Sequence, residues 1–159
     1  MNAKANSGRD SSDLTRSHIK ERRFREMEQM KAGAVICKRY KIREFLGSGG
    51  FGVVFSAYDQ VLQSEVALKF LNPGLSLSPR KFRRVRREIN LSRRITDPRI
   101  VKVFSLEAWR GLHFLVMERV RGCSLADYLQ NRPGPVSWQE FSGIFLSILE
   151  GVRVLHRHG

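Results

Sequence analysis

The sequence is poor in cysteine and histidine and has no long apolar run, and these absences exclude several kinds of protein. Its 159 residues include two cysteines, Cys37 and Cys123, which form neither a C-x-x-C pair nor a disulfide framework. The four histidines show no metal-ligand spacing. No apolar run reaches the roughly 18 residues of a membrane span, and the N-terminus lacks the apolar core of a secretory signal. We therefore expect a cytoplasmic protein with no membrane span and no metal site.

Acidic residues are also scarce, because 15 Asp and Glu face 29 Lys and Arg, which gives a formal net charge of +14. Such an excess attracts acidic partners, whether a nucleotide, a nucleic acid, an acidic protein or an anionic lipid, although solvated basic faces would explain it equally well. Hydrophobic residues make up 42% of the chain, which is enough to bury a core. The length suits one domain, or one domain and part of another.

Residues 1–34 are expected to form a basic, polar tail. The first 17 residues are rich in Ser, Asn, Asp and Lys with little to bury, so we expect them to be disordered. Residues 18–31 can form a short helix with Phe24, Met27 and Met30 on one side. This apolar stripe is thin, so the pattern favours a solvated linker over a docking segment.

What the chain does contain is a glycine-rich stretch at residues 46–54, with the pattern G-x-G-x-x-G-x-V. Strands are predicted on both sides of it, at residues 40–46 and 52–58, with a third at 65–70. Glycines at this spacing allow a tight turn and bring backbone N–H groups close to a phosphate. Dinucleotide-binding folds share the triple glycine but place a helix directly after it. Because Val53-Val54-Phe55 continues as a strand, that alternative is disfavoured.

A helix is predicted over residues 79–95, with Ser78 as its N-cap. One half of its helical wheel is apolar and the other half carries arginines. Glu88 lies in the middle of the apolar half, where an unpaired carboxylate is costly. Lys69, on the strand Val66-Ala67-Leu68-Lys69, is a candidate partner. The alternatives are a glutamate at the margin of a shallow apolar face and an exposed strand lysine.

The remaining pattern predicts two strands and two helices around a polar connector. The strands lie at residues 100–107 and 112–117, the connector at 118–122, and the helices at 124–130 and 137–158. The last helix begins with a capping box, Ser137-x-x-Glu140, and carries eight apolar residues along one arc. We expect these eight side chains to be buried against another part of the protein.

These elements, in this order, resemble the eukaryotic-type protein kinase domain over residues 40–159, in the style of the bacterial serine/threonine kinases. Residues 46–54 are similar to the glycine-rich loop of that family, and residues 66–69 resemble its V-A-I-K strand. Glu88 falls at the position of the family's helix glutamate. Further matches are Ile100-Val101-Lys102-Val103, Leu115-Val116-Met117-Glu118 with Met117 at the gatekeeper position, and Arg121-Gly122-Cys123-Ser124-Leu125.

The resemblance implies an α+β fold. It predicts a small lobe with a five-stranded antiparallel sheet and one helix, followed by the first helices of a helical large lobe. We therefore expect the tail to cover residues 1–34 and a partial kinase domain to cover residues 35–159. Within that domain the resemblance places the small lobe at 35–117, the hinge at 118–122 and the start of the large lobe at 123–159.

The resemblance also implies an ATP site. Lys69 would neutralise the α- and β-phosphates and Glu88 would hold Lys69 in place, so these two are the candidate catalytic residues. Val54 and Ala67 would sandwich the adenine, and backbone N–H groups of residues 48–52 would approach the β- and γ-phosphates. The candidate cofactor-binding residues are Leu46, Gly47, Ser48, Gly49, Gly50, Phe51, Gly52, Val53, Val54, Ala67, Lys69, Met117, Glu118 and Val120, the backbones of Glu118 and Val120 reaching the adenine edge.

Phosphoryl transfer in this family needs H-R-D-x-x-x-x-N and D-F-G, and neither motif occurs in the 159 residues. His156-Arg157 is followed by His158 rather than Asp. Leaving the apolar arc of the last helix uncovered would forfeit roughly 1.5–3 kcal/mol for each of its side chains. We therefore expect the N-terminal part of a serine/threonine kinase, inactive alone. It would use Mg²⁺ only if the missing residues were supplied.

Two alternatives remain open. One is a catalytically dead nucleotide-binding remnant, or pseudokinase, that acts through protein contacts. The other is nucleic-acid binding by residues 80–102, which carry ten Lys and Arg against two acidic residues, a net charge of +8. This segment is without the alternating aromatic residues that stack on bases. It therefore favours a phosphorylated or acidic protein segment over nucleic acid. The other expected partners of the chain are ATP and a protein substrate or regulatory partner.

Overall fold

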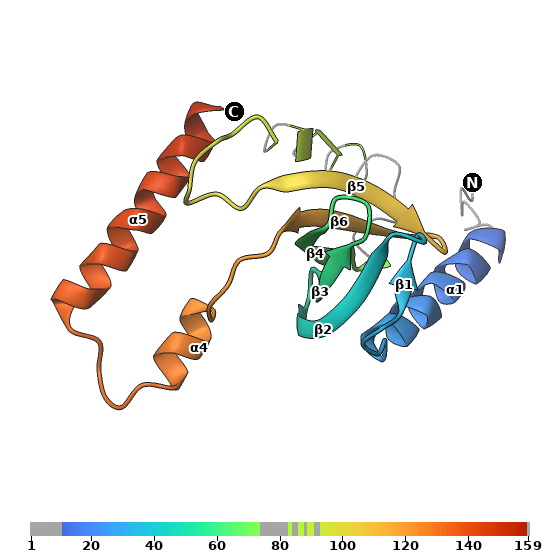
Figure 1. The fold of residues 1–159 in the computed structure, drawn as a ribbon, viewed down its shortest axis with the longest axis horizontal. Helices are drawn as coiled ribbons and strands as arrows, with labels where there is room; N and C mark the ends of the chain where they lie inside the picture. Colours follow the sequence, from blue (N-terminus) through green and yellow to red (C-terminus); the bar gives the residue numbers. More distant parts are fainter. Residues whose placement is uncertain (1–10, 74–82, 84–85, 88, 91–92, 159) are drawn as a thin grey trace, which may run out of the picture.

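The computed structural model describes residues 11–73, 83, 86–87, 89–90 and 93–158, and Figure 1 shows their arrangement. An N-terminal helix precedes a six-stranded sheet, and two helices follow it. The elements are α1 (Ser11–Glu28), β1 (Val35–Ile36), β2 (Tyr40–Gly49), β3 (Gly52–Asp59), β4 (Ser64–Leu71), β5 (Val103–Trp109), β6 (Leu112–Glu118), α4 (Leu125–Gln130) and α5 (Trp138–Arg157). No helix of this described part is long and apolar enough to cross a membrane.

The sheet is antiparallel throughout and runs in the order β1-β2-β3-β4-β6-β5. It is strongly curled, so that its first strands approach β5 (Figure 1). The Tyr40 hydroxyl on β2 spans this approach and donates to Glu107 on β5 at 2.6 Å. Successive side chains of a strand point to opposite faces of the sheet. The side chains on one face can therefore pack into a core, while those on the other face can contact a ligand.

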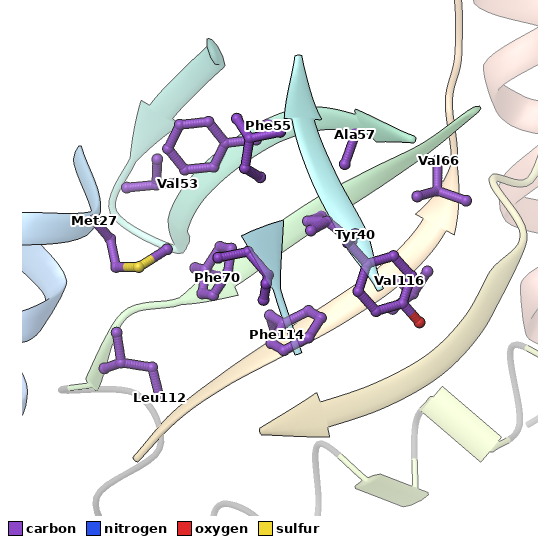
Figure 2. Packing of buried hydrophobic residues seen from close by; sticks show 13 residues of the cluster. Met27, Tyr40, Val53, Phe55, Ala57, Val66, Phe70, Leu112, Phe114 and Val116 are labelled. Carbon is purple, nitrogen blue, oxygen red and sulfur yellow. The ribbon is translucent and has the colours of Figure 1, made fainter. Parts of the chain in front are cut away.

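The core lies inside the curl and is rich in aromatic rings (Figure 2). The rings of Phe70 and Phe114 stack with centroids 4.9 Å apart, and Phe55 meets Phe70 edge to face at 6.2 Å. All three side chains are fully buried. Each such burial contributes about 1.5–3 kcal/mol, so the alternation of Val, Phe and Leu in β3, β4 and β6 explains why these segments become strands.

The α+β class is confirmed, but the sheet has six strands where five were expected. The additional strand is β1, whose two residues pair with Lys41 and Tyr40 on β2. The turn between them places Cys37 and Lys38 at φ values of 52° and 56°. Asn and Gly are the residues that normally adopt this left-handed region in a two-residue hairpin turn. Since neither occurs here, the sequence carries no turn signal for the hairpin.

The N-terminal segment differs from the expected polar tail. Helix α1 spans Ser11–Glu28, and Met27 near its end is only 2% exposed inside the core (Figure 2). Phe24 and Met30 pack against the same core, and the Arg23 guanidinium donates to the carbonyl of Arg110 at 2.5 Å. A stripe this thin could not build a core of its own, but here it closes the end of one that the sheet has already formed. Residues 1–10 lie outside the described residues.

The two C-terminal helices are confirmed, and α5 begins at the predicted cap, Ser137. Ser124 and Asp127 form a complete capping box at the start of α4. At α5 only half of the expected box forms, because Ser137 accepts from the Glu140 N–H while the Glu140 carboxylate pairs with Arg132 at 2.8 Å. The Glu140 carboxylate also accepts a hydrogen bond from Tyr128 on α4. This residue therefore ties the two helices together instead of closing its own cap.

Among the described residues, helix α5 closely approaches the segment before β5 at Gly151. Gly151 is buried, and a Cβ built on it would lie 3.6 Å from both Arg99 Cβ and Ile100 Cδ1. The helix predicted over residues 79–95 falls largely outside the described residues. Of the described residues in this range, 83, 86, 87, 89 and 90 are helical, and they agree with the predicted wheel, since Ile89 is buried and Arg86 and Arg87 are exposed. Arg93 and Arg94 instead form a turn and Ile95 is not helical, so the prediction of a helix as far as residue 95 was wrong.

Candidate functional site

The glycine-rich stretch forms the turn between β2 and β3. Strand pairing continues to Gly49 opposite Gly52, which leaves Gly50 and Phe51 at the tip. Gly52 has a φ of 143°, and a Cβ built there would lie 1.9 Å from the carbonyl oxygen of Phe70 on β4. Glycine is therefore required at this position for β3 to pair with β4. A Cβ on Gly49 or Gly50 would meet no described atom within 4 Å, so this side of the turn is open.

Lys69 lies on β4 beneath this turn. Its side chain is half-buried, and its Nζ atom lies 5.8 Å from the centroid of the Phe51 ring. The ring itself is 71% exposed at the tip of the turn. The contact between an ammonium and an aromatic face brings the lysine charge to the open side of the glycine turn. Glu88, the predicted partner of Lys69, lies outside the described residues, so that pairing stays a prediction.

The predicted base-binding side chains share the face of the sheet that points away from the core. Residues directly opposite one another on antiparallel strands lie on the same face. Two neighbouring rows cross β3, β4 and β6 in this way, namely Val54, Lys69 and Leu115, and then Ser56, Ala67 and Met117. Leu46 lies beside them on β2, at a bulge between Phe45 and Gly47. The structure thus brings together the predicted glycine turn, lysine, alanine, valine and methionine.

The connector, residues 118–122, leaves this face at the end of β6. The Glu118 N–H donates to the carbonyl of Lys102 at 2.9 Å, and the Glu118 carboxylate accepts from the Lys102 N–H at 3.3 Å. The N–H of Glu118 is therefore committed to the segment before β5, which leaves its carbonyl as the group it could offer to a ligand. The Val120 carbonyl accepts a hydrogen bond from the Arg119 guanidinium. The Val120 N–H is correspondingly the group of that residue that could donate to a ligand.

The described residues contain no group of three or more His, Cys, Asp or Glu that could hold a metal ion.

A family model of the protein kinase domain matches residues 40–159, which include the glycine turn, Lys69 and the connector. This chain belongs to the protein kinase domain family. The match begins at the first residue of β2, so α1 and β1 precede it.

Curated relatives of the chain are bacterial serine/threonine kinases, in agreement with the resemblance. A probable serine/threonine-protein kinase, pknA2 of Bifidobacterium longum, is 33% identical over 136 residues, 84% of this chain and 18% of the relative. The serine/threonine-protein kinase PrkC of Bacillus subtilis is 31% identical over 129 residues, 81% of this chain and 20% of the relative. The chain thus spans about a fifth of the length of these relatives.

Solved structures show the same fold at lower identity. The PknI kinase domain of Mycobacterium tuberculosis superposes with a TM-score of 0.72 and 22% identity, over 82% of this chain and 52% of that one. The open face with Lys69 and the connector therefore belong to a kinase fold of which this chain spans about half.

Two ion pairs of the sheet and connector were missed by the sequence reasoning. Arg39 and Asp59 form two hydrogen bonds of 2.9 and 2.6 Å at the start of the β2–β3 pair, and the guanidinium holds the pKa of the buried Asp59 carboxyl below its usual value. Arg119 of the connector pairs with Glu44 on β2 at 3.1 Å. Partners 20 and 75 residues apart carry no spacing signal, and only the register of the sheet reveals them.

Proposed function

We propose that this chain is the ATP-binding portion of a serine/threonine protein kinase. The observation that carries the proposal is the row Val54–Lys69–Leu115, which places the lysine ammonium beneath an open glycine turn on the face opposite the core. An ammonium beside backbone N–H groups with little side-chain cover is suited to a polyphosphate. The family match and the bacterial serine/threonine relatives support the same proposal.

At the base end, the adenine would lie between Leu46 and Val54 on one side and the connector on the other. Ala67 in the next row, with its small side chain, would leave room for the ring. The Glu118 carbonyl would accept from the adenine amino group and the Val120 N–H would donate to a ring nitrogen. This assignment of acceptor and donor agrees with the hydrogen bond that the Glu118 N–H already donates to the Lys102 carbonyl.

At the phosphate end, the N–H groups of residues 48–52 would approach the β- and γ-phosphates, and Lys69 would neutralise the α- and β-phosphates. Glu88 would hold the lysine by a charge-assisted hydrogen bond. Mg²⁺, when bound, would supply positive charge to the phosphates, and its ligands in this family belong to motifs that the 159 residues do not include.

These residues would therefore bind ATP without transferring its γ-phosphate. Transfer to a Ser or Thr hydroxyl requires the catalytic-loop Asp and the second metal Asp, which would have to be supplied by further chain. In this proposal residues 35–117 form the small lobe, 118–122 the hinge and 123–159 the start of the large lobe.

A second candidate is a pseudokinase module that acts through protein contacts. The observation that favours it is the apolar surface of α5, where Leu146, Ile148 and Leu149 are exposed. A contiguous patch of exposed apolar side chains on a helix is typical of a protein interaction site. The exposed arginines at 83, 86, 87, 93 and 94 offer a separate surface for an acidic or phosphorylated protein segment.

The test is ATP binding by purified residues 1–159, measured by titration calorimetry, for the unsubstituted chain and for Lys69→Met. We expect Lys69→Met to weaken ATP binding at least about tenfold, because it removes a charge-assisted contact to phosphate. The matched control is Lys41→Met, which removes a lysine from an exposed position on β2 and should leave the affinity within about twofold.

The first candidate requires ATP binding at this face, whereas a module that acts through protein contacts does not. Absence of ATP binding by the unsubstituted chain, or binding that ignores Lys69→Met, would refute an ATP site at this face. Retained ATP binding with transfer of the γ-phosphate to a protein would show instead that these residues need no further motif.

A further inference from the structure

Two arginines of the connector reach back to the sheet, and they do so differently. Arg119 Nη2 lies 3.1 Å from Glu44 Oε1 on β2, and Arg121 Nη2 lies 3.1 Å from Glu65 Oε2 on β4. The Arg119 side chain is 20% exposed and its partner Glu44 is 59% exposed, whereas Arg121 is 85% exposed and its partner Glu65 is 37% exposed. Solvent screens a charge that it surrounds more than one that it reaches from one side only. The Arg119 guanidinium is therefore the less screened of the two and the better placed to hold the connector.

Arg119 makes a second contact that Arg121 lacks among the described interactions. Its guanidinium also donates to the carbonyl of the next residue, Val120. A guanidinium presents several N–H groups in one rigid plane, so it can hold a carboxylate and a carbonyl at once. The backbone at Val120 is thereby joined through Arg119 to a carboxylate on β2.

The position of Glu44 on this face results from an irregularity in β2. The pairing with β3 shifts between Ile42 and Glu44, so that Glu44 lies opposite Ser56 rather than facing the core. Such a bulge inserts one residue and redirects the side chains that follow. Without it, the strict alternation that buries Ile42 would also turn Glu44 inward, away from Arg119.

We propose that Arg119, anchored by Glu44, is a positioning residue that sets the spacing between the connector and β2, and with it the fit of the nucleotide base. This inference rests on the proposed ATP site. The base would lie between Leu46 and Val54 on one side and the backbone of Glu118 and Val120 on the other. The Arg119–Glu44 pair joins the connector to β2 two residues before Leu46, away from the glycine turn.

The test compares four variants of residues 1–159, Arg119→Gln, Glu44→Gln, the double variant and Arg121→Gln, in titrations with ATP and with inorganic tripolyphosphate. We expect Arg119→Gln and Glu44→Gln each to weaken ATP binding about tenfold, and the double variant to be no weaker than either single one. Tripolyphosphate has no base, so its affinity should change less than about twofold for Glu44→Gln. Arg121→Gln controls for the loss of one positive charge.

Glu44→Gln decides between positioning and simple electrostatics, because the two predict opposite signs. Removing a carboxylate makes the site more positive, which by charge alone would tighten the binding of an anionic nucleotide. Weaker ATP binding by Glu44→Gln, with tripolyphosphate binding retained, supports the positioning role. Unchanged or tighter ATP binding, or equal losses for Arg119→Gln and Arg121→Gln, would overturn it while leaving the ATP site intact. Absence of ATP binding by the unsubstituted chain would instead remove the proposed function itself.

Discussion

Replacing Met27 by alanine should destabilise the fold by about 2–5 kcal/mol, the usual cost of truncating a fully buried methionine. Met27 is 2% exposed and packs in the same cluster as Phe70 and Phe114. It already lines a cavity of about 70 Å³ together with Trp109 and Leu112, so the shorter side chain would enlarge an existing void. This cost is a large share of the roughly 5–15 kcal/mol that stabilises a typical domain.

The measurement is urea unfolding of residues 1–159 followed by circular dichroism. The matched control is Ile19→Ala on the same helix, because Ile19 is 46% exposed and alanine is the better helix former. We expect this control to change the free energy of unfolding by less than about 0.5 kcal/mol. A difference between the two variants isolates the docking of α1 on the core from its helical propensity.

Equal stability of the Met27→Ala and Ile19→Ala variants would refute the docking of α1. It would restore the interpretation of residues 1–34 as a solvated tail, since a tail has no core contact to lose. A loss at Met27 alone would make α1 an integral part of the small sheet-bearing unit, although the family match begins only at residue 40.

Two further predictions concern the sheet. Gly52→Ala should cost about 2–4 kcal/mol, since its Cβ would overlap the Phe70 carbonyl, whereas Gly50→Ala should cost under about 1 kcal/mol; equal unfolding midpoints would contradict this. Arg39→Gln should cost about 2–3 kcal/mol near neutral pH. Because folding lowers the pKa of Asp59 from 3.8, its contribution is complete above that pKa and is lost as the pH falls through the lower folded value. Unfolding measured against pH should therefore show a flatter acid limb for Arg39→Gln than for the exposed Arg22→Gln.

Most strands and the two C-terminal helices were predictable because their signals are local. Apolar residues in β3 and β4 located those strands, and the capping box at Ser137 marked where α5 begins. The glycine turn was predictable for a different reason. The sequence pattern of residues 46–54 constrains the backbone directly, and the structure shows the constraint at Gly52 in the contact that a side chain would make with Phe70.

The features that escaped prediction depend on contacts between distant residues. The turn at Cys37 and Lys38 adopts left-handed angles with residues that give no such signal, and it is held because Ile36 is buried and paired with Tyr40. Met27 belongs to a stripe too thin to predict burial, and its partners lie on strands far along the chain. Periodicity reports which face of an element is apolar, but it does not report which other element covers that face.

The two ends of the candidate site are held by interactions of different strength. At the glycine turn, Phe51 is exposed and its ring faces the Lys69 ammonium at 5.8 Å, a contact worth about 0.5–1 kcal/mol at an exposed site. A phosphate that paired with Lys69 would exceed that contact, so the turn can rearrange around a ligand at little cost. The connector is joined to β2 through the largely covered Arg119, whose ion pair with Glu44 must break before the connector can move away from β2. In the proposed ATP site, the base end would therefore be the preorganised half and the phosphate end the adaptable one, so substitutions at Arg119 and Lys69 would probe separate steps of recognition.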